Sequence, residues 1–190
     1  MVYLFLANGF EMIEALTPVD LLRRAGVELK TVSINKSKTV FSTHNVGIEA
    51  DMTIDEMPSF EILTSTLDGI ILPGGMPGAK NLDECKKLDE IIAFAATLGE
   101  YKKVIISAIC AAPFILGKRG LLDGKKAICY PGFEAQLKGA NVLSGSAKVA
   151  VDGNFITGKA MGCATEFALE LVNAFCGLDK KEAVAQSIYY

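Results

Sequence analysis

Residues 104–118 read VIISAICAAPFILGK, and this stretch decides the fold that the sequence predicts. Residues 104–109 form a continuous apolar run, which is typical of a strand buried on both faces of a parallel sheet. Cys110 follows directly, and two alanines lead to Pro113, where a short helical stretch ending at Lys118 begins. The stretch therefore predicts a strand, a sharp turn and a helix, with a cysteine at the turn.

The same order of strand, turn and helix recurs on both sides of this stretch. Residues 2–7 form an apolar run that ends at Asn8-Gly9, and residues 10–24 have helical spacing and stop at Gly26. The other expected elements are strands at 28–34, 67–72 and 126–129, an irregular hairpin at 36–51, a tight hairpin of 149–151 with 155–157, and helices at 82–98, 164–176 and 180–187. This alternation predicts a doubly wound α/β sandwich with a mostly parallel central sheet.

Composition and charge exclude several classes of protein. The chain has 190 residues, is 51% hydrophobic, and shows no linker or repeat, so we expect one domain over residues 1–190 rather than disorder. Nineteen basic and 22 acidic side chains give a net charge of −3 without a basic stripe, which argues against a nucleic-acid partner. Residues 1–6 lack the flank of a signal peptide, and the apolar run at 104–116 is too short to span a membrane. We expect a cytoplasmic protein without membrane contact.

The cysteines and the single histidine indicate free thiols rather than a metal site. The cysteines are odd in number, widely spread and without a C-x-x-C pair: Cys85, Cys110, Cys129, Cys163 and Cys176. This pattern argues against a disulfide framework and a zinc site. His44 lies in a polar stretch at the expected hairpin tip, where a surface role and a catalytic role are both open. No phosphate-binding glycine motif is present, so we expect neither a metal nor an organic cofactor.

Cys110 is the candidate nucleophile. A sharp turn from strand to helix lifts a side chain above the edge of the sheet in many α/β enzymes. The turn would also bring the sulfur near a helix N-terminus, whose partial positive charge favours the thiolate. The alternative is a buried cysteine that acts as a small hydrophobic side chain.

Glu14 and two glycines are expected at the same edge of the sheet. Glu14 begins the first helix, on one face with Glu11, and burial beside a thiolate would raise its pKa and make it a proton donor near neutrality. The alternative is an exposed carboxylate that complements the helix dipole. Gly74 and Gly75 end the third strand, where their N–H groups could form an oxyanion hole or simply a tight link.

Several motifs in register resemble the ThiJ/PfpI superfamily, and most closely its parkinsonism-associated branch of YajL-like deglycases. They are GFEMIE at 9–14, TPVDLLRRAG at 17–26, LPGGMPGA at 72–79, AICAAP at 108–113 and EFAL at 166–169. The resemblance implies a flavodoxin-like sandwich, a homodimer, and an oxidation-prone cysteine at Cys110. It further implies a protonated Glu14 bonded to that cysteine, with Gly75 and Ala111 as backbone donors.

Two departures from the family pattern bear on the chemistry. Tyr130 stands where many relatives place a histidine, and the usual Gly-Pro-Gly-Thr turn reads AMGC at 160–163. A protease or amidase needs imidazole as the general base for its cysteine, so this reading is weakened unless His44 arrives from elsewhere, for example across a dimer. The hydroxyl of Tyr130 could still hold a substrate oxygen.

Two classes of function therefore compete. The first is a cofactor-independent enzyme of the stress response, a glyoxalase or deglycase, in which the Cys110 thiolate attacks a reactive aldehyde or glycated side chain and Glu14 moves the proton. The second is a redox sensor or chaperone switched by a Cys110 sulfinate. A thiazole-pathway or amidase-like role follows only from family naming.

Overall fold

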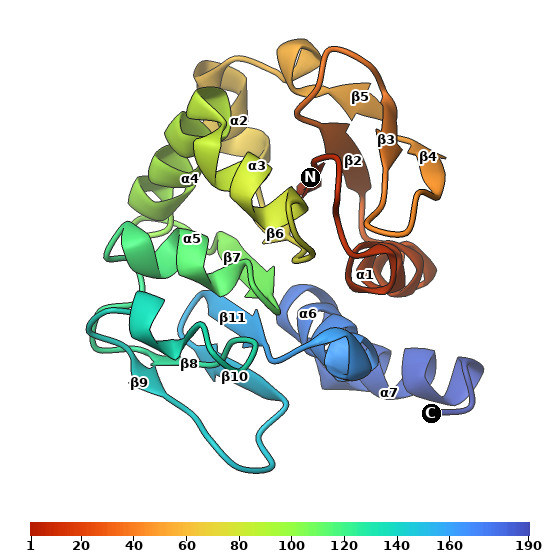
Figure 1. Ribbon diagram of the computed structural model, residues 1–190. Coiled ribbons are helices and arrows are strands. Elements are labelled where there is room, and N and C mark those ends of the chain that lie inside the picture. Colours follow the sequence, from red (N-terminus) through yellow and green to blue (C-terminus); the bar gives the residue numbers. More distant parts are fainter.

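The computed structural model describes residues 1–190, built around a mostly parallel sheet of seven strands (Figure 1). The strand order is β10-β11-β7-β6-β1-β2-β5, and only the β10–β11 pair is antiparallel. The strands are β1 (Val2–Leu6), β2 (Leu29–Ser33), β5 (Met52–Thr53), β6 (Gly69–Leu72), β7 (Ile105–Ile109), β10 (Val149–Asp152) and β11 (Phe155–Gly158). The predicted α/β class with a mostly parallel sheet is confirmed.

Helices cover both faces of this sheet (Figure 1). The helices are α1 (Met12–Arg24), α2 (Phe60–Thr66), α3 (Gly78–Glu84), α4 (Lys86–Leu98), α5 (Pro113–Lys118), α6 (Ala164–Cys176) and α7 (Leu178–Ser187). One apolar cluster joins Phe5 and Ile106 to α2–α5, and a second joins Leu4 and Ile71 to α1, α6 and α7. Successive strand residues thus enter opposite clusters, which explains why the strands are apolar throughout.

Two small sheets decorate the sandwich. The first is the antiparallel pair of β3 (Thr39–Phe41) and β4 (Gly47–Glu49), which confirms the hairpin expected within residues 36–51. The second pairs β8 (Lys126–Ala127) with β9 (Asn141–Val142) in parallel. No helix is long and apolar enough to cross a membrane.

The structure differs from the sequence-based prediction in four elements. The helix expected over 82–98 is two helices, because Cys85 takes an extended conformation between α3 and α4. Helix α2 and strands β5 and β9 were not predicted. Helix α2 has seven residues, of which only Leu63 is buried, and each of the two strands has two residues, so none of them shows a usable period.

Replacing Phe167 by Ala tests the core beneath α6. Phe167 is fully buried in the cluster shared by α1, α6 and the sheet. Removing its ring leaves a cavity, and we expect Phe167→Ala to lower the free energy of unfolding by about 3–5 kcal/mol. The measurement is urea denaturation. Ile62→Ala is the control, because that side chain on α2 is 53% exposed and its loss should cost much less. Equal losses in both variants would contradict this packing.

Candidate active site

The site lies where the carboxyl ends of four neighbouring parallel strands meet. Cys110 follows β7, Gly74 and Gly75 follow β6, Glu11 and the start of α1 follow β1, and residues 160–162 follow β11. Ligands of open α/β sheets bind at this edge. The topology therefore gathers chain segments from across the sequence around one cysteine.

The backbone of Cys110 forms a strained turn between β7 and α5. Its φ angle is +65°, in the left-handed region that residues with a side chain rarely adopt. Two hydrogen bonds hold this conformation. The Cys110 N–H donates to the Gly158 carbonyl at 2.9 Å, and the Tyr130 N–H donates to the Cys110 carbonyl at 2.8 Å. The thiol is partly exposed, so the turn presents it at the edge of the sheet as the sequence predicted.

Glu14 is fully buried beside this cysteine. Its Oε2 accepts a hydrogen bond of 2.9 Å from the N–H of Gly74. Its Oε1 makes no hydrogen bond within the protein. Burial raises the pKa of Glu14 to about 7, and the charge of Glu11 adds to this, while the Cys110 side chain and the N–H groups of Gly74 and Met161 oppose it. Glu14 can therefore hold or release a proton near neutral pH.

The thiol of Cys110 is affected by the same carboxyl group. Burial and then the negative charge of nearby Glu14 raise the pKa of Cys110, whereas the N–H groups of Ala111 and Gly75 lower it. The sequence predicted a pKa lowered by a helix N-terminus. The direction found here is the opposite, because burial of the thiol and the nearby charge of Glu14 outweigh the N–H groups that favour the thiolate. The two groups titrate as a pair, and the first proton leaves near pH 7.

Gly74 allows the two groups to approach each other. A Cβ atom at this position would lie 2.6 Å from Oε2 of Glu14 and 2.8 Å from Cβ of Cys110, which is too close for any side chain. The predicted oxyanion role is not available to its N–H, because that N–H already donates to Glu14. Gly75, with a φ of +86°, and Ala111 remain as backbone donors facing the sulfur.

An open cavity of about 260 Å³ gives access to the sulfur. Its walls come from the four loops at the sheet edge and from the segment after β8: Glu11, Glu14, Gly75, Cys110, Tyr130, Ala160, Met161 and Gly162. The Tyr130 side chain is about half exposed here, at the position predicted to contact substrate. No group of three or more His, Cys, Asp or Glu side chains comes together as metal ligands would.

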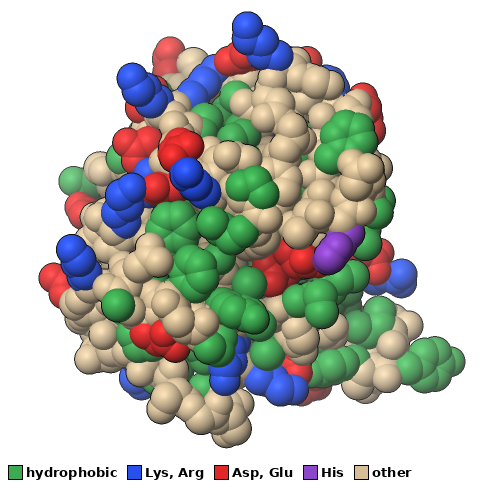
Figure 2. Space-filling model, in the orientation of Figure 1, with side chains coloured by type: hydrophobic (Ala, Val, Ile, Leu, Met, Phe, Trp, Pro, Cys, Tyr) green, Lys and Arg blue, Asp and Glu red, His purple; other side chains and the backbone are tan.

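His44 lies near this site but does not line the cavity. It is exposed on the turn between β3 and β4, where the sequence placed it. The N–H of the preceding Thr43 donates to the Phe10 carbonyl at 2.8 Å, which ties the turn to the start of α1. Figure 2 shows acidic side chains beside the single histidine in this region.

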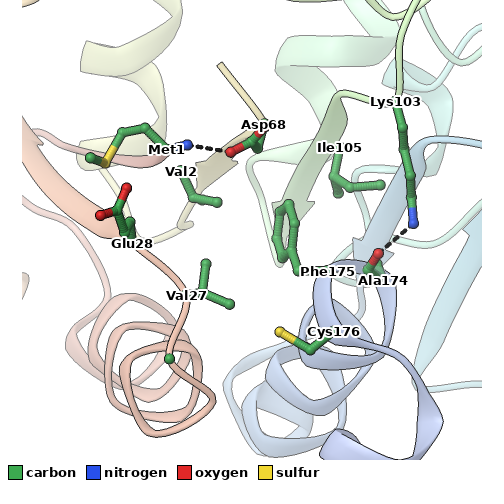
Figure 3. A pocket seen from close by; sticks show the side chains of 11 residues that line it. Met1, Val2, Val27, Glu28, Asp68, Lys103, Ile105, Ala174, Phe175 and Cys176 are labelled. Atoms are coloured by element: carbon green, nitrogen blue, oxygen red, sulfur yellow. Dashed lines mark hydrogen bonds and ion pairs between the residues drawn. The ribbon is translucent and has the colours of Figure 1, made fainter. Parts of the chain in front are cut away.

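The largest cavity, of about 390 Å³, lies at the opposite edge of the sheet (Figure 3). Its walls include residues at the amino ends of β1, β6 and β7, such as Val2, Asp68 and Ile105. Figure 3 shows the amino group of Met1 paired with Asp68, and Lys103 donating to the Ala174 carbonyl. Cys110 and Glu14 take no part in it, so this cavity is separate from the candidate site.

Fold and site together define an α/β protein with a cysteine at a strand-to-helix elbow and a buried glutamate next to it. The model of the DJ-1/PfpI family matches residues 1–174, so the chain belongs to the DJ-1/PfpI family. It is 34% identical to Protein DJ-1 homolog B of Arabidopsis thaliana over 180 residues, which is 94% of this chain and 39% of the relative. The chain thus spans about two fifths of that relative.

Two further comparisons cover most of both proteins. A deglycase of Pyrococcus horikoshii is 32% identical over 154 residues, 80% of this chain and 86% of the relative. The structure of oxidised DJ-1 from Toxoplasma gondii has a TM-score of 0.87 at 32% identity, and the match covers 100% of this chain and 97% of that one. The fold is therefore that of DJ-1 superfamily structures.

Periodicity and spacing did not place residues 160–162 or Glu11 in the wall of the cavity, although the family resemblance marked the turn at 160–163 as bearing on the chemistry. Met161 and Gly162 belong to a short 3-10 helix after β11, a strand that lies next to β7. They lie near Cys110 because β11 and β7 are neighbours in the sheet. The local periodicity of the sequence does not show which strands are neighbours. Glu11 was visible as a partner of Glu14 on one helix face, and that spacing was the only signal.

The raised pKa of Glu14 predicts how Glu14→Gln alters stability with pH. Below about pH 4.5 the carboxyl is protonated whether the chain is folded or unfolded, so its charge has no effect. Between pH 4.5 and about 7 the unfolded chain ionises first, so native Glu14 costs stability that reaches about 3 kcal/mol above pH 7. We expect the difference in unfolding free energy, variant minus wild type, to rise over this range.

Urea denaturation from pH 4 to 8 measures this difference. Glu100→Gln, a substitution of an exposed carboxylate before β7, is the control for the loss of one charge. A difference between Glu14→Gln and wild type that stays constant with pH would contradict the raised pKa.

Proposed function

We propose that this protein is a cysteine-dependent stress-response enzyme that acts on reactive dicarbonyls such as methylglyoxal, or on their adducts with protein side chains. The observation that carries the proposal is the fully buried Glu14, with a pKa of about 7, beside the partly exposed thiol of Cys110. A group with this pKa can both accept and return a proton at neutral pH. The deglycase relative supports the same substrate class.

The first step is addition of Cys110 to the aldehyde carbon. The sulfur forms a bond to that carbon, ionised Glu14 takes the thiol proton, and Glu14 then passes this proton to the carbonyl oxygen, which gives a hemithioacetal. The N–H groups of Gly75 and Ala111 and the hydroxyl of Tyr130 are the candidate donors to the developing oxygen charge. The raised pKa of Cys110 makes a neighbouring proton acceptor necessary for this step.

The second step is an internal proton transfer followed by hydrolysis. Glu14 moves the C–H proton from the former aldehyde carbon to the adjacent carbonyl carbon, the hemithioacetal hydroxyl gives up its proton to the oxygen on that adjacent carbon, and a thioester of a 2-hydroxy acid results. Water then cleaves the thioester, releases the hydroxy acid and restores the thiol. Two-electron oxidation at one carbon balances reduction at its neighbour, so water is the only co-reactant.

The proposed reaction predicts that loss of methylglyoxal depends on one cysteine. Purified wild-type protein should consume methylglyoxal and release lactate, and Cys110→Ser should reduce the rate at least a hundredfold, because the hydroxyl is a much weaker nucleophile than a thiol. Cys176→Ser is the matched control, since Cys176 is exposed at the end of α6. Equal rates in wild type and Cys110→Ser would end the proposal.

A second candidate function is redox sensing, with Cys110 oxidised to the sulfinate. Oε1 of Glu14 is buried without a hydrogen-bond partner, and a protonated carboxyl beside Cys110 would donate to a sulfinate oxygen. Two equivalents of peroxide would supply the two oxygen atoms and leave as water. The likeness to an oxidised DJ-1 structure supports this candidate.

Mild peroxide treatment followed by peptide mass mapping tests the sensor. We expect Cys110 to gain two oxygens before any other cysteine does, and this selectivity to fall in Glu14→Gln, which keeps the shape of the side chain but cannot supply the acid proton. Buried Cys129, whose pKa burial raises to about 11, is the internal control. Similar oxidation of all five cysteines would count against sensing.

The remaining expectations stay predictions. They are a homodimer, a cytoplasmic location, and a small aldehyde or glycated side chain as the binding partner. An amidase-like role has little support in the cavity, because its walls contain no imidazole.

A further inference from the structure

The cavity above Cys110 carries negative charge and no basic side chain. Glu11 and Glu14 are its only ionisable wall residues apart from Cys110 and Tyr130. Lys148 and Lys159 lie on the flanking segments, but Lys148 pairs with Glu166 and Lys159 donates to the Gly145 carbonyl at 3.0 Å. A molecule that reaches the sulfur therefore passes acidic groups without meeting a free cation in the wall.

Glu11 is placed so that its charge acts on a molecule that approaches Cys110. It is the residue before the first turn of α1, partly exposed, and its N–H donates to the Gly74 carbonyl at 2.9 Å, so its backbone is fixed. Glu14 is fully buried and is partly protonated at neutral pH. The charge of Glu11 already contributes to the raised pKa of Glu14, so its field reaches the reacting groups.

We propose that Glu11 is a specificity-determining residue that makes this site favour neutral or positively charged carbonyl compounds and disfavour α-oxo acids. A carboxylate on the substrate would approach Glu11 at close range, where like charges repel, whereas an ammonium or guanidinium group would be attracted. The identity of the substrate class rests on the proposed function. The charge selection itself applies to any reagent that reaches Cys110.

The test uses two thiol reagents of similar size and opposite charge. Methanethiosulfonates that carry a trimethylammonium or a sulfonate group form a mixed disulfide with a thiol and release methanesulfinate. Their rates at Cys110 are followed by mass mapping of its peptide, and each rate is divided by that of N-acetylcysteine under the same conditions. Both rates depend on the same ionised fraction of the Cys110 thiol, so this fraction cancels in the ratio of the two normalised rates. The ratio therefore reports the local electrostatic field.

In wild type at low ionic strength we expect this ratio to favour the cationic reagent by about tenfold, and to fall towards one as salt is added. Glu11→Gln should reduce the ratio by about three- to tenfold, because it removes the charge and keeps the shape. Glu100→Gln, the same change at the opposite edge of the sheet, should leave it unchanged.

A wild-type ratio of one at low salt, or an equal ratio in wild type and Glu11→Gln, would overturn the proposal. A wild-type ratio of one at low salt overturns the proposal even where the variant folds poorly. Turnover is not needed for this readout, so a protein that fails to consume methylglyoxal can still show the charge selection.

Discussion

The buried carboxyl group of Glu14 beside the sulfur of Cys110 is the interaction on which the chemistry of this protein depends. A carboxyl group without solvent and with one unpartnered oxygen resists ionisation, and here the result is a proton that is exchanged near neutral pH. The same carboxyl group opposes ionisation of the thiol. One acidic proton is thus shared between the two groups, and in the proposed functions the pair would supply a base for attack on a carbonyl or an acid for a sulfur oxyanion.

The fold holds Glu14 and Cys110 together, and the backbone of Cys110 is locally strained. Cys110 has a positive φ angle, and the absence of a side chain at Gly74 leaves just enough room for the carboxyl and the thiol. Two well-packed apolar layers on either face of the sheet fix β1, β6, β7 and β11, whose carboxyl ends supply the site. Stability is therefore concentrated in the sandwich, whereas the reactive groups occupy its edge.

The sequence predicted the fold class and an arrangement in which Cys110 and Glu14 meet at one edge of the sheet, and it failed where the information was not local. Buried strands such as β7 are recognisable in the sequence as apolar runs, and a cysteine directly after such a run indicates a sharp turn from strand to helix. The direction of the Cys110 pKa shift depends first on how deeply the thiol is buried and then on the charge of Glu14 beside it, and the residue pattern shows neither the burial nor the approach of the two groups. The approach of Met161 to the site required the neighbour relation of β11 and β7, which only the folded chain reveals.

The most direct test of the central claim is the pH dependence of Cys110 alkylation by neutral iodoacetamide, measured in wild type and in Glu14→Gln. If one proton is shared between carboxyl and thiol, the wild-type rate rises through an inflection near pH 7, where Glu14 ionises and can accept the thiol proton. In Glu14→Gln the inflection should move to higher pH, because the thiol must then ionise alone in its buried setting. Superimposable curves for the two proteins would show that Glu14 does not govern the cysteine.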